Sequence, residues 1–94
     1  MSIVRFSHKE LEKLFETGKS KIGVRYKDNA LGILDLINAA TCVKDLAGAK
    51  DFHMLTGDMA GYYSMHVNGN WTITFKFDNG DKGDAVDVDF VDYH

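Results

Sequence analysis

The sequence predicts an α+β fold in which two N-terminal helices pack on one face of a twisted, mainly antiparallel sheet of four to five strands. Apolar residues recur at helical spacing in the first 40 residues, and beyond residue 50 they alternate with polar residues. Such alternation leaves one apolar sheet face for the helices to cover. The 94 residues, 45% of them hydrophobic, are expected to form one domain over residues 1–94.

The first helix is predicted over residues 8–17, after a short strand over residues 3–6. Ser7 and Glu10 have the spacing of a capping box, in which the two side chains accept backbone N–H groups at the helix start. Gly18 suits the helix end, because glycine adopts the left-handed conformation without strain. The apolar face of this helix comprises Leu11, Leu14 and Phe15.

The second helix is predicted over residues 25–40. Asp28 lies near its start, where the helix dipole favours a carboxylate. Gly32 costs about 1 kcal/mol relative to Ala, so the first turns are the weaker part. Leu31 and Leu36 fall outside the core-facing stripe, and we expect them to form an exposed apolar patch suited to a protein partner. The core-facing stripe comprises Ala30, Ile33, Leu34, Ile37 and Ala40.

Three strands are predicted over residues 63–67, 71–77 and 86–90. The pair Asn79–Gly80 marks the turn before the last strand, since this dipeptide favours tight turns. Each strand is expected to direct alternate residues to the helices and to solvent. In the last strand, the face toward the helices is expected to comprise Val86, Val88 and Phe90.

The parity of the two central strands predicts their register. A two-residue loop would place the apolar residues of one strand beside the polar residues of its partner, which a single buried face forbids. A three-residue loop over residues 68–70 avoids this conflict and makes His66 and Thr72 neighbours on the exposed face. The loop then requires a positive φ at Gly69 or Asn70. The other predicted pairs are Val67 with Trp71 and Met65 with Ile73.

Charge is divided unevenly along the chain. Residues 1–50 carry nine Lys or Arg and six Asp or Glu, whereas residues 51–94 carry two Lys and eight Asp. Because neutralising phosphates supplies most of the non-specific affinity for nucleic acid, the acidic half argues against strong RNA binding there. It favours a cationic partner surface instead.

The chain lacks the sequence features of a membrane or secreted protein. It has no run of about 18 apolar residues, and its first residues lack the apolar stretch of a signal peptide. Its one cysteine, Cys42, cannot form an internal disulfide, which fits a reducing compartment. We therefore expect a cytoplasmic protein that makes no membrane contact.

Polar side chains that can carry chemistry gather on the exposed sheet face and at the chain end. A solvated sheet face is the simpler interpretation of this pattern. A metal site from His53, His66, His94 and Asp92 lacks the usual HxxxH or HxH spacing, and no cofactor-binding fingerprint is present, so we expect neither metal nor cofactor. The face comprises Tyr62, Ser64, His66, Thr72, Thr74, Lys76, Asp87 and Asp89, and the chain end adds Asp92, Tyr93 and His94.

Three segments resemble the HigB branch of the RelE-like bacterial toxins: His53–Asp58, Asn70–Phe75 and Asp92–His94. The usual family patterns there are HPLKGD, NWRITF and a terminal DYH, and further matches in the same order extend over nearly the whole chain. The resemblance implies a RelE-like fold and metal-independent cleavage of messenger RNA on the ribosome. It also implies a helix-turn-helix antitoxin of the HigA type, through which alone the pair would contact operator DNA.

The resemblance also implies the site residues. In this cleavage a 2′-hydroxyl attacks the adjacent phosphate, a base removes its proton, an acid protonates the leaving oxygen, and cations stabilise the added charge. The matching positions are His53, Asp92, Tyr93 and His94. Asp92 and His94 are the acid and base candidates, whereas Tyr93 either stacks on a nucleobase, orders the terminus or packs at a strand end.

Two positions depart from the family patterns, and both departures remove a positive charge. Thr56 replaces the Lys of HPLKGD, and Thr72 replaces the Arg of NWRITF. Losing one preorganised donor at such a site typically costs about 100- to 1,000-fold in rate. His66 stands where the family usually has a small polar residue, and a protonated His66 beside Thr72 would partly replace the missing Arg.

Three functions remain open on these residues. The first is an active, ribosome-dependent mRNA endonuclease, which the frame of His53, Asp92 and His94 favours. The second is a catalytically weakened toxin homologue that acts as antitoxin partner and transcriptional co-repressor. The two lost cations, the acidic half and the absence of Lys and Arg from Asp28–Leu36 favour this second function. The third is an unrelated small domain.

Overall fold

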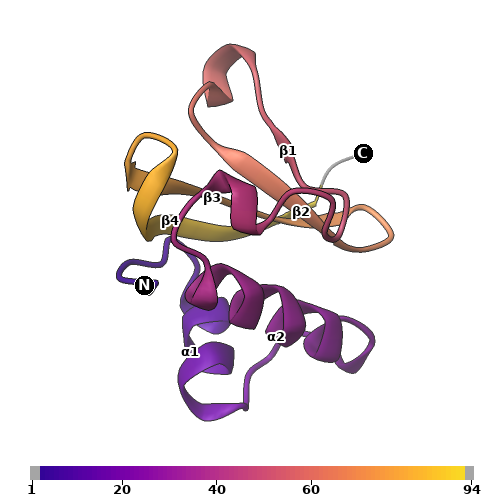
Figure 1. Ribbon diagram of the computed structural model, residues 1–94. Coiled ribbons are helices and arrows are strands. Elements are labelled where there is room, and N and C mark those ends of the chain that lie inside the picture. Colours follow the sequence, from indigo (N-terminus) through magenta and orange to yellow (C-terminus); the bar gives the residue numbers. More distant parts are fainter. Residues whose placement is uncertain (1–2, 93–94) are drawn as a thin grey trace.

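The computed structural model describes residues 3–92 as two helices followed by a four-stranded antiparallel sheet (Figure 1). The fold class predicted from the sequence is thereby confirmed. The sheet has the strand order β1-β2-β3-β4, so neighbouring strands follow one another along the chain. The helices are α1 (Lys9–Thr17) and α2 (Val24–Ala39), and the strands are β1 (His53–Met54), β2 (Tyr63–Asn68), β3 (Trp71–Asn79) and β4 (Lys82–Asp92). Short 3-10 turns, η1 (Val43–Asp45) and η2 (Gly57–Met59), lie between α2 and β2.

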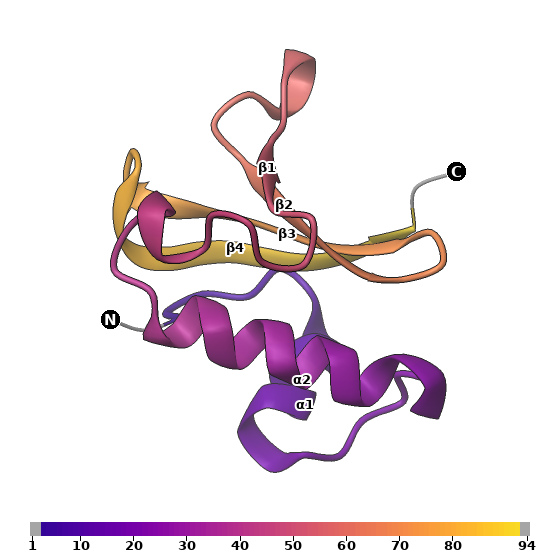
Figure 2. The same cartoon turned by 45° about the vertical axis from the view of Figure 1, so that its right-hand side comes forward.

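Both helices lie against the same face of the sheet, as Figure 2 shows. The core between the two layers consists of apolar side chains from both helices and from β2, β3 and β4. Burying this apolar area is the main favourable contribution to folding. The fully buried members include Leu11, Leu14, Ala30, Ile33, Leu34, Met65, Ile73, Phe75 and Val88.

The N-terminal segment lies beside β4 but forms isolated bridges rather than the predicted strand. Ile3 pairs with Ala85 and Phe6 with Val88, both in parallel orientation. Between the two bridges, the backbone N–H of Val88 donates a 3.2 Å hydrogen bond to the carbonyl of Arg5. The segment nevertheless occupies the β4 edge of the sheet.

Helix α1 begins with a cap different from the predicted one. His8 is the N-cap residue, and its Nδ1 atom accepts a hydrogen bond of 3.1 Å from the backbone N–H of Leu11. The predicted capping box of Ser7 and Glu10 is wrong, because the Glu10 carboxylate accepts a 2.8 Å hydrogen bond from the backbone N–H of Lys21. The helix ends as predicted at Gly18, which has a φ of 77°.

Helix α2 buries the predicted stripe but does not form the predicted apolar patch. Ala30, Ile33, Leu34, Ile37 and Ala40 are all buried. The remaining two leucines differ, since the one at position 31 packs against the core and the one at position 36 stays 39% exposed. The helix therefore exposes a single leucine rather than a patch of two.

The hairpin between β2 and β3 confirms most of the predicted register. His66 pairs with Thr72, and Gly69 has a φ of 58°. At the tip, however, Asn68 pairs with Trp71, because a bulge follows His66. The carbonyl of Val67 leaves the ladder and accepts a 3.0 Å hydrogen bond from the side-chain amide of Asn29 in α2. The bulge thus ties the hairpin to the helix layer.

Strand β4 contains a second bulge, at Asp87. Thr74 pairs with Asp89 but Lys76 pairs with Val86, so β4 has one residue more than β3 over this stretch. Asp87 adopts a φ of 53° at this point. The prediction that Val86 faces the helices is wrong, since the bulge turns it to the face of Lys76.

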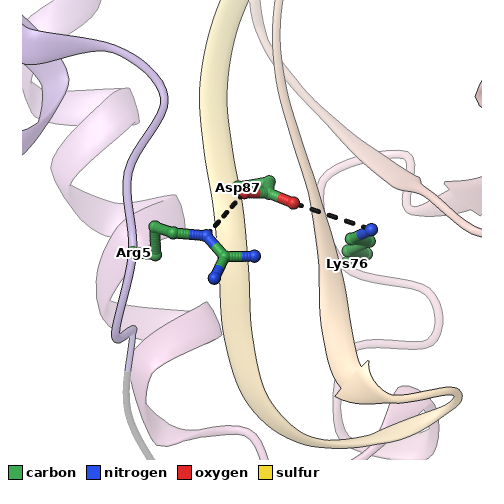
Figure 3. A network of polar contacts seen from close by, with 3 residues as sticks. All are labelled: Arg5, Lys76 and Asp87. Carbon is green, nitrogen blue, oxygen red and sulfur yellow. Dashed lines mark hydrogen bonds and ion pairs between the residues drawn. The ribbon is translucent and has the colours of Figure 1, made fainter.

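The Asp87 carboxylate is held by two cations from separate parts of the chain (Figure 3). One oxygen lies 2.7 Å from Nε of Arg5, and the other lies 3.6 Å from Nζ of Lys76. The hydrogen bond from Arg5 lowers the pKa of Asp87 below its ordinary value. The ion pair therefore joins the N-terminal segment to the bulge.

Replacing Asp87 with Asn is expected to lower stability slightly at pH 7, because Asn tolerates the left-handed backbone but removes the charge. A carboxyl whose pKa is depressed on folding stabilises the fold above its unfolded pKa and loses this effect as the pH falls through the folded pKa. The difference between wild type and Asp87→Asn should therefore be smaller at pH 3 than at pH 7. Urea unfolding of both proteins at both pH values measures this difference in the free energy of unfolding. An equal loss of stability at the two pH values would contradict a contribution from the ion pair.

Candidate functional site

A cavity opens on the sheet face that the helices leave uncovered. It has a volume of about 230 Å³ and lies where the end of β2, the start of β3 and the loop before β1 meet. The predicted residues His53, His66 and Thr72 all line it. The other lining residues are Asp51, Ser64, Gly69 and Asn70.

The ring of His53 is hydrogen-bonded at both nitrogens. Nδ1 lies 2.8 Å from the carbonyl oxygen of Asp51, and because a carbonyl only accepts, we assign the proton to Nδ1. Nε2 lies 3.1 Å from Oγ of Ser64, whose side chain is 1% exposed. In the neutral ring, Nε2 therefore accepts from the serine hydroxyl. These two contacts fix the plane and the tautomer of the imidazole.

His66 is held at one nitrogen. Nε2 lies 2.8 Å from the carbonyl oxygen of Gly69, so this nitrogen carries a proton and donates it to the hydrogen bond. The side chain is exposed on the cavity face, opposite Thr72 in β3. Nδ1 is the ring nitrogen that this arrangement leaves for a bound molecule.

The two histidines are connected by a strained loop. Lys50 and Asp51 both adopt left-handed backbone conformations, with φ values of 48° and 58°. The carbonyl of Lys50 accepts a 2.8 Å hydrogen bond from the backbone N–H of His66, and the next carbonyl accepts from the ring of His53. Left-handed residues other than glycine cost about 1–2 kcal/mol each, and such strain is concentrated at functional sites.

The polar face is less exposed than the alternation predicted. Ser64 and Thr74 are each 1% exposed, and Thr72 is 8% exposed. Small side chains on a pleated face are covered by larger neighbours, as the contact between His53 and Ser64 shows. Only the longer side chains of this face reach solvent, among them His66.

Among the described residues, the predicted site positions Thr56 and Asp92 do not line the cavity. Thr56 is the N-cap of η2, beyond β1, so the lost cation at this position lies outside the lining. Asp92 ends β4, where it pairs with Trp71. Tyr93 and His94 lie outside the described residues.

Sequence reasoning placed Ser64 on this face but gave it no role in the site, and it missed Asp51 altogether. The alternation along β2 indicated that Ser64 lies on the same face as His66, because the two residues are two positions apart. Asp51 precedes β1 in a loop without periodicity. Its role depends on its backbone carbonyl, which no residue type reveals.

Within residues 3–92, no group of three or more His, Cys, Asp or Glu side chains is arranged to hold a metal ion. The lining residues also include no Lys or Arg. The lining includes the imidazoles of His53 and His66, and imidazole is a side chain that can transfer protons near neutral pH. In the same part of the chain, neither helix is long and apolar enough to cross a membrane.

Comparisons with known proteins identify the family of the chain. Residues 4–94 match the family model of the RelE-like toxin of type II toxin–antitoxin systems, HigB. The chain therefore belongs to the HigB-like family of toxins, which pair with an antitoxin. It is also similar to the endoribonuclease HigB of Proteus vulgaris, with 39% identity over 94 residues that cover 98% of this chain and 99% of that protein.

Replacing Lys50 with Val tests the strained loop. A β-branched residue is poorly tolerated at positive φ, so we expect Lys50→Val to lower the free energy of unfolding by about 1–2 kcal/mol. Lys50→Gly is expected to be neutral or stabilising, because glycine adopts this conformation freely. Urea unfolding measures both changes, and Ala47→Val at an exposed position of the same loop is the control. Equal effects of Lys50→Val and Ala47→Val would contradict the assigned strain.

Proposed function

We propose that this chain is an endoribonuclease that cleaves messenger RNA without a metal, at the cavity that contains His53 and His66. The observation that carries the proposal is the presence of two oriented imidazoles in one cavity on the open sheet face. The similarity to the endoribonuclease HigB of Proteus vulgaris supports the same activity. RNA cleavage of this kind needs proton transfer at two oxygens, which imidazole performs near neutral pH.

The roles follow from the hydrogen bonds of each ring. Nδ1 of His66 removes the proton of the attacking 2′-hydroxyl, because its Nε2 is already committed to a backbone carbonyl. His53 is oriented by Ser64 and shapes the wall of the cavity beside the phosphate. His94 remains the candidate for the acid that protonates the leaving 5′-oxygen, since Asp92 pairs with Trp71 outside the lining of this cavity. Tyr93 is proposed to stack on a nucleobase.

The lining of the cavity favours a second function, a weakened toxin that serves mainly as antitoxin partner and transcriptional co-repressor. Thr72 offers a hydroxyl where the family has Arg, and no cation lines the cavity within the described residues. The added charge of the transition state is then stabilised less, at a typical cost of about 100- to 1,000-fold per lost donor. We propose cleavage as the primary function and expect it to be slow.

The proposed partners follow from the family. A helix-turn-helix antitoxin of the HigA type would neutralise the toxin and would supply the contacts with operator DNA. The ribosome would present the messenger RNA, in the cytoplasm. The acidic second half of the chain contributes little to DNA contact, because it carries eight Asp and two Lys.

Induced expression of the chain without antitoxin tests the proposed activity. We expect growth arrest, with primer extension showing cleavage of abundant messages at ribosome-positioned sites. His66→Ala should reduce cleavage at least about 100-fold, the usual contribution of a general base. Lys44→Gln, an exposed change in η1, is the control. Normal growth and intact messages with soluble, folded wild-type protein would contradict the proposal and favour the co-repressor.

Restoring the two family cations tests the weakened site. The double variant Thr56→Lys with Thr72→Arg is expected to raise the cleavage rate at least about 10-fold, because each restored cation stabilises the developing charge. Primer extension after matched induction gives the ratio of rates. Ala47→Lys, an exposed substitution in the loop after η1, controls for the added charge. An unchanged rate would show that the missing cations do not limit the protein.

A further inference from the structure

A second cavity lies on the helix side of the sheet, away from the candidate site. It has a volume of about 240 Å³ and is bordered by the loop between the helices and by one end of β3 and β4. Pockets for drug-sized ligands measure roughly 300–1,000 Å³, so this one fits a smaller group such as a single aromatic ring system. The lining residues that matter here are His8, Lys21, Ile22, Tyr26, Trp71 and Phe90.

The walls of this cavity are aromatic. The rings of Trp71 and Phe90 stack with centroids 4.5 Å apart and planes at 14°, and the ring of Tyr26 lies 6.0 Å from that of Trp71. Trp71 and Tyr26 are only half-buried, so part of each ring remains accessible. Accessible aromatic rings beside cations are the platforms on which nucleobases stack.

His8 adds a polar group of defined direction. Its Nδ1 accepts the backbone N–H of Leu11, so its Nε2 carries the proton and is a hydrogen-bond donor. The ring stands edge-on to Phe90, with centroids 5.9 Å apart. A donor at the rim of an aromatic cavity matches the carbonyl and ring-nitrogen acceptors of a nucleobase.

Positive charge is concentrated in the segment that borders the cavity. Residues 17–27 contain four cations and no acid, although the whole chain has a net charge of −3. Arg25 lies over the Tyr26 ring, with Cζ 5.8 Å from the centroid. Glu10 is the acid in the lining, and its carboxylate accepts the backbone N–H of Lys21. The four cations are Lys19, Lys21, Arg25 and Lys27.

This basic segment is joined to the candidate site through the β2–β3 hairpin. The side-chain amide of Asn68 donates to the carbonyl of Arg25 over 3.4 Å, and Asn29 donates to the carbonyl of Val67 over 3.0 Å. The turn of the same hairpin, Gly69 and Asn70, lines the cavity of the candidate site. An extended chain that crosses the hairpin tip would therefore reach both cavities.

We propose that the second cavity binds one base of single-stranded RNA while the cations of residues 19–27 neutralise the neighbouring phosphates. The choice of RNA as ligand rests on the proposed function, because the cavity extends the path of the chain that the histidines cleave. Charge complementarity favours RNA over a protein segment, since four cations in nine residues attract a polyanion. The cavity thus holds the substrate on the side of the sheet opposite the reacting phosphate.

Trp71 makes the proposal directly testable, because it is the single tryptophan of the chain. The probe is a nine-nucleotide RNA with 2′-O-methyl groups, which cannot undergo attack by the 2′-oxygen. We expect its addition to quench Trp71 fluorescence and the affinity to fall with salt, by a slope of about 0.7 per phosphate contact. The double variant Lys21→Glu with Arg25→Glu should weaken binding at least about 10-fold, whereas the matched control Lys44→Glu should not.

Tyr26→Leu separates stacking from charge, because leucine keeps the cavity filled but removes the ring. It is expected to weaken binding several-fold with an unchanged salt slope. Absent quenching, or equal affinity for Lys21→Glu/Arg25→Glu and Lys44→Glu, would overturn the proposal. Quenching by the antitoxin but not by RNA would overturn it as well, and would assign the cavity to the protein partner.

Cleavage assays distinguish the failure of this proposal from that of the proposed function. If the wild-type chain binds the probe at Trp71 but never cleaves messenger RNA, RNA binding at the second cavity is supported and the proposed endoribonuclease activity is rejected. If the chain cleaves messenger RNA, the double variant Lys21→Glu with Arg25→Glu cleaves it equally well, and the probe does not quench Trp71, the endoribonuclease activity is supported. RNA binding at the second cavity is then rejected. The supporting result is quenching together with slower cleavage by the double variant.

Discussion

Two helices can cover only one face of the sheet, and this constraint places the polar residues of the site on the other. Met65 and Ile73 are buried in the core between helices and sheet, so the adjacent residues His66 and Thr72 point away from it. The candidate site is therefore a consequence of the two-residue period of β2 and β3. The loop before β1 completes it by bringing His53 against the opposite strand.

The periodicity of apolar residues predicted the helices, the antiparallel sheet and most of the register between β2 and β3. The reason is that the buried positions of a helix or strand are apolar and recur with the period of that element. The predictions failed where one distant hydrogen bond decides the local structure. The carbonyl of Val67 accepts a hydrogen bond from Asn29, which is 38 residues away in the sequence, and not from the neighbouring strand. The carboxylate of Asp87 accepts a hydrogen bond from Arg5, which is 82 residues away. No local pattern contains such partners, so the bulges after His66 and at Asp87 could not be predicted.

The residues of the candidate site also fall into those that the sequence predicted and those that it did not. Parity and family resemblance together located His53, His66 and Thr72, since these residues depend on strand geometry and on side-chain type. The left-handed pair Lys50 and Asp51 was missed, because it acts through backbone carbonyls that any residue possesses. The assignments of Tyr93 and His94 rest on resemblance alone, as both lie outside residues 3–92.

The two edges of the sheet are both unsuited to accept another strand. Strand β1 contains two residues, and the N-terminal segment lies along β4 through the bridges at Ile3 and Phe6. Long, flat edges invite strands from other copies and lead to aggregation, whereas short or covered edges do not. Met54 is 68% exposed on β1, yet so brief a strand offers few backbone groups to a neighbour. A toxin molecule released from its antitoxin would thus resist edge-to-edge polymerisation with other released molecules.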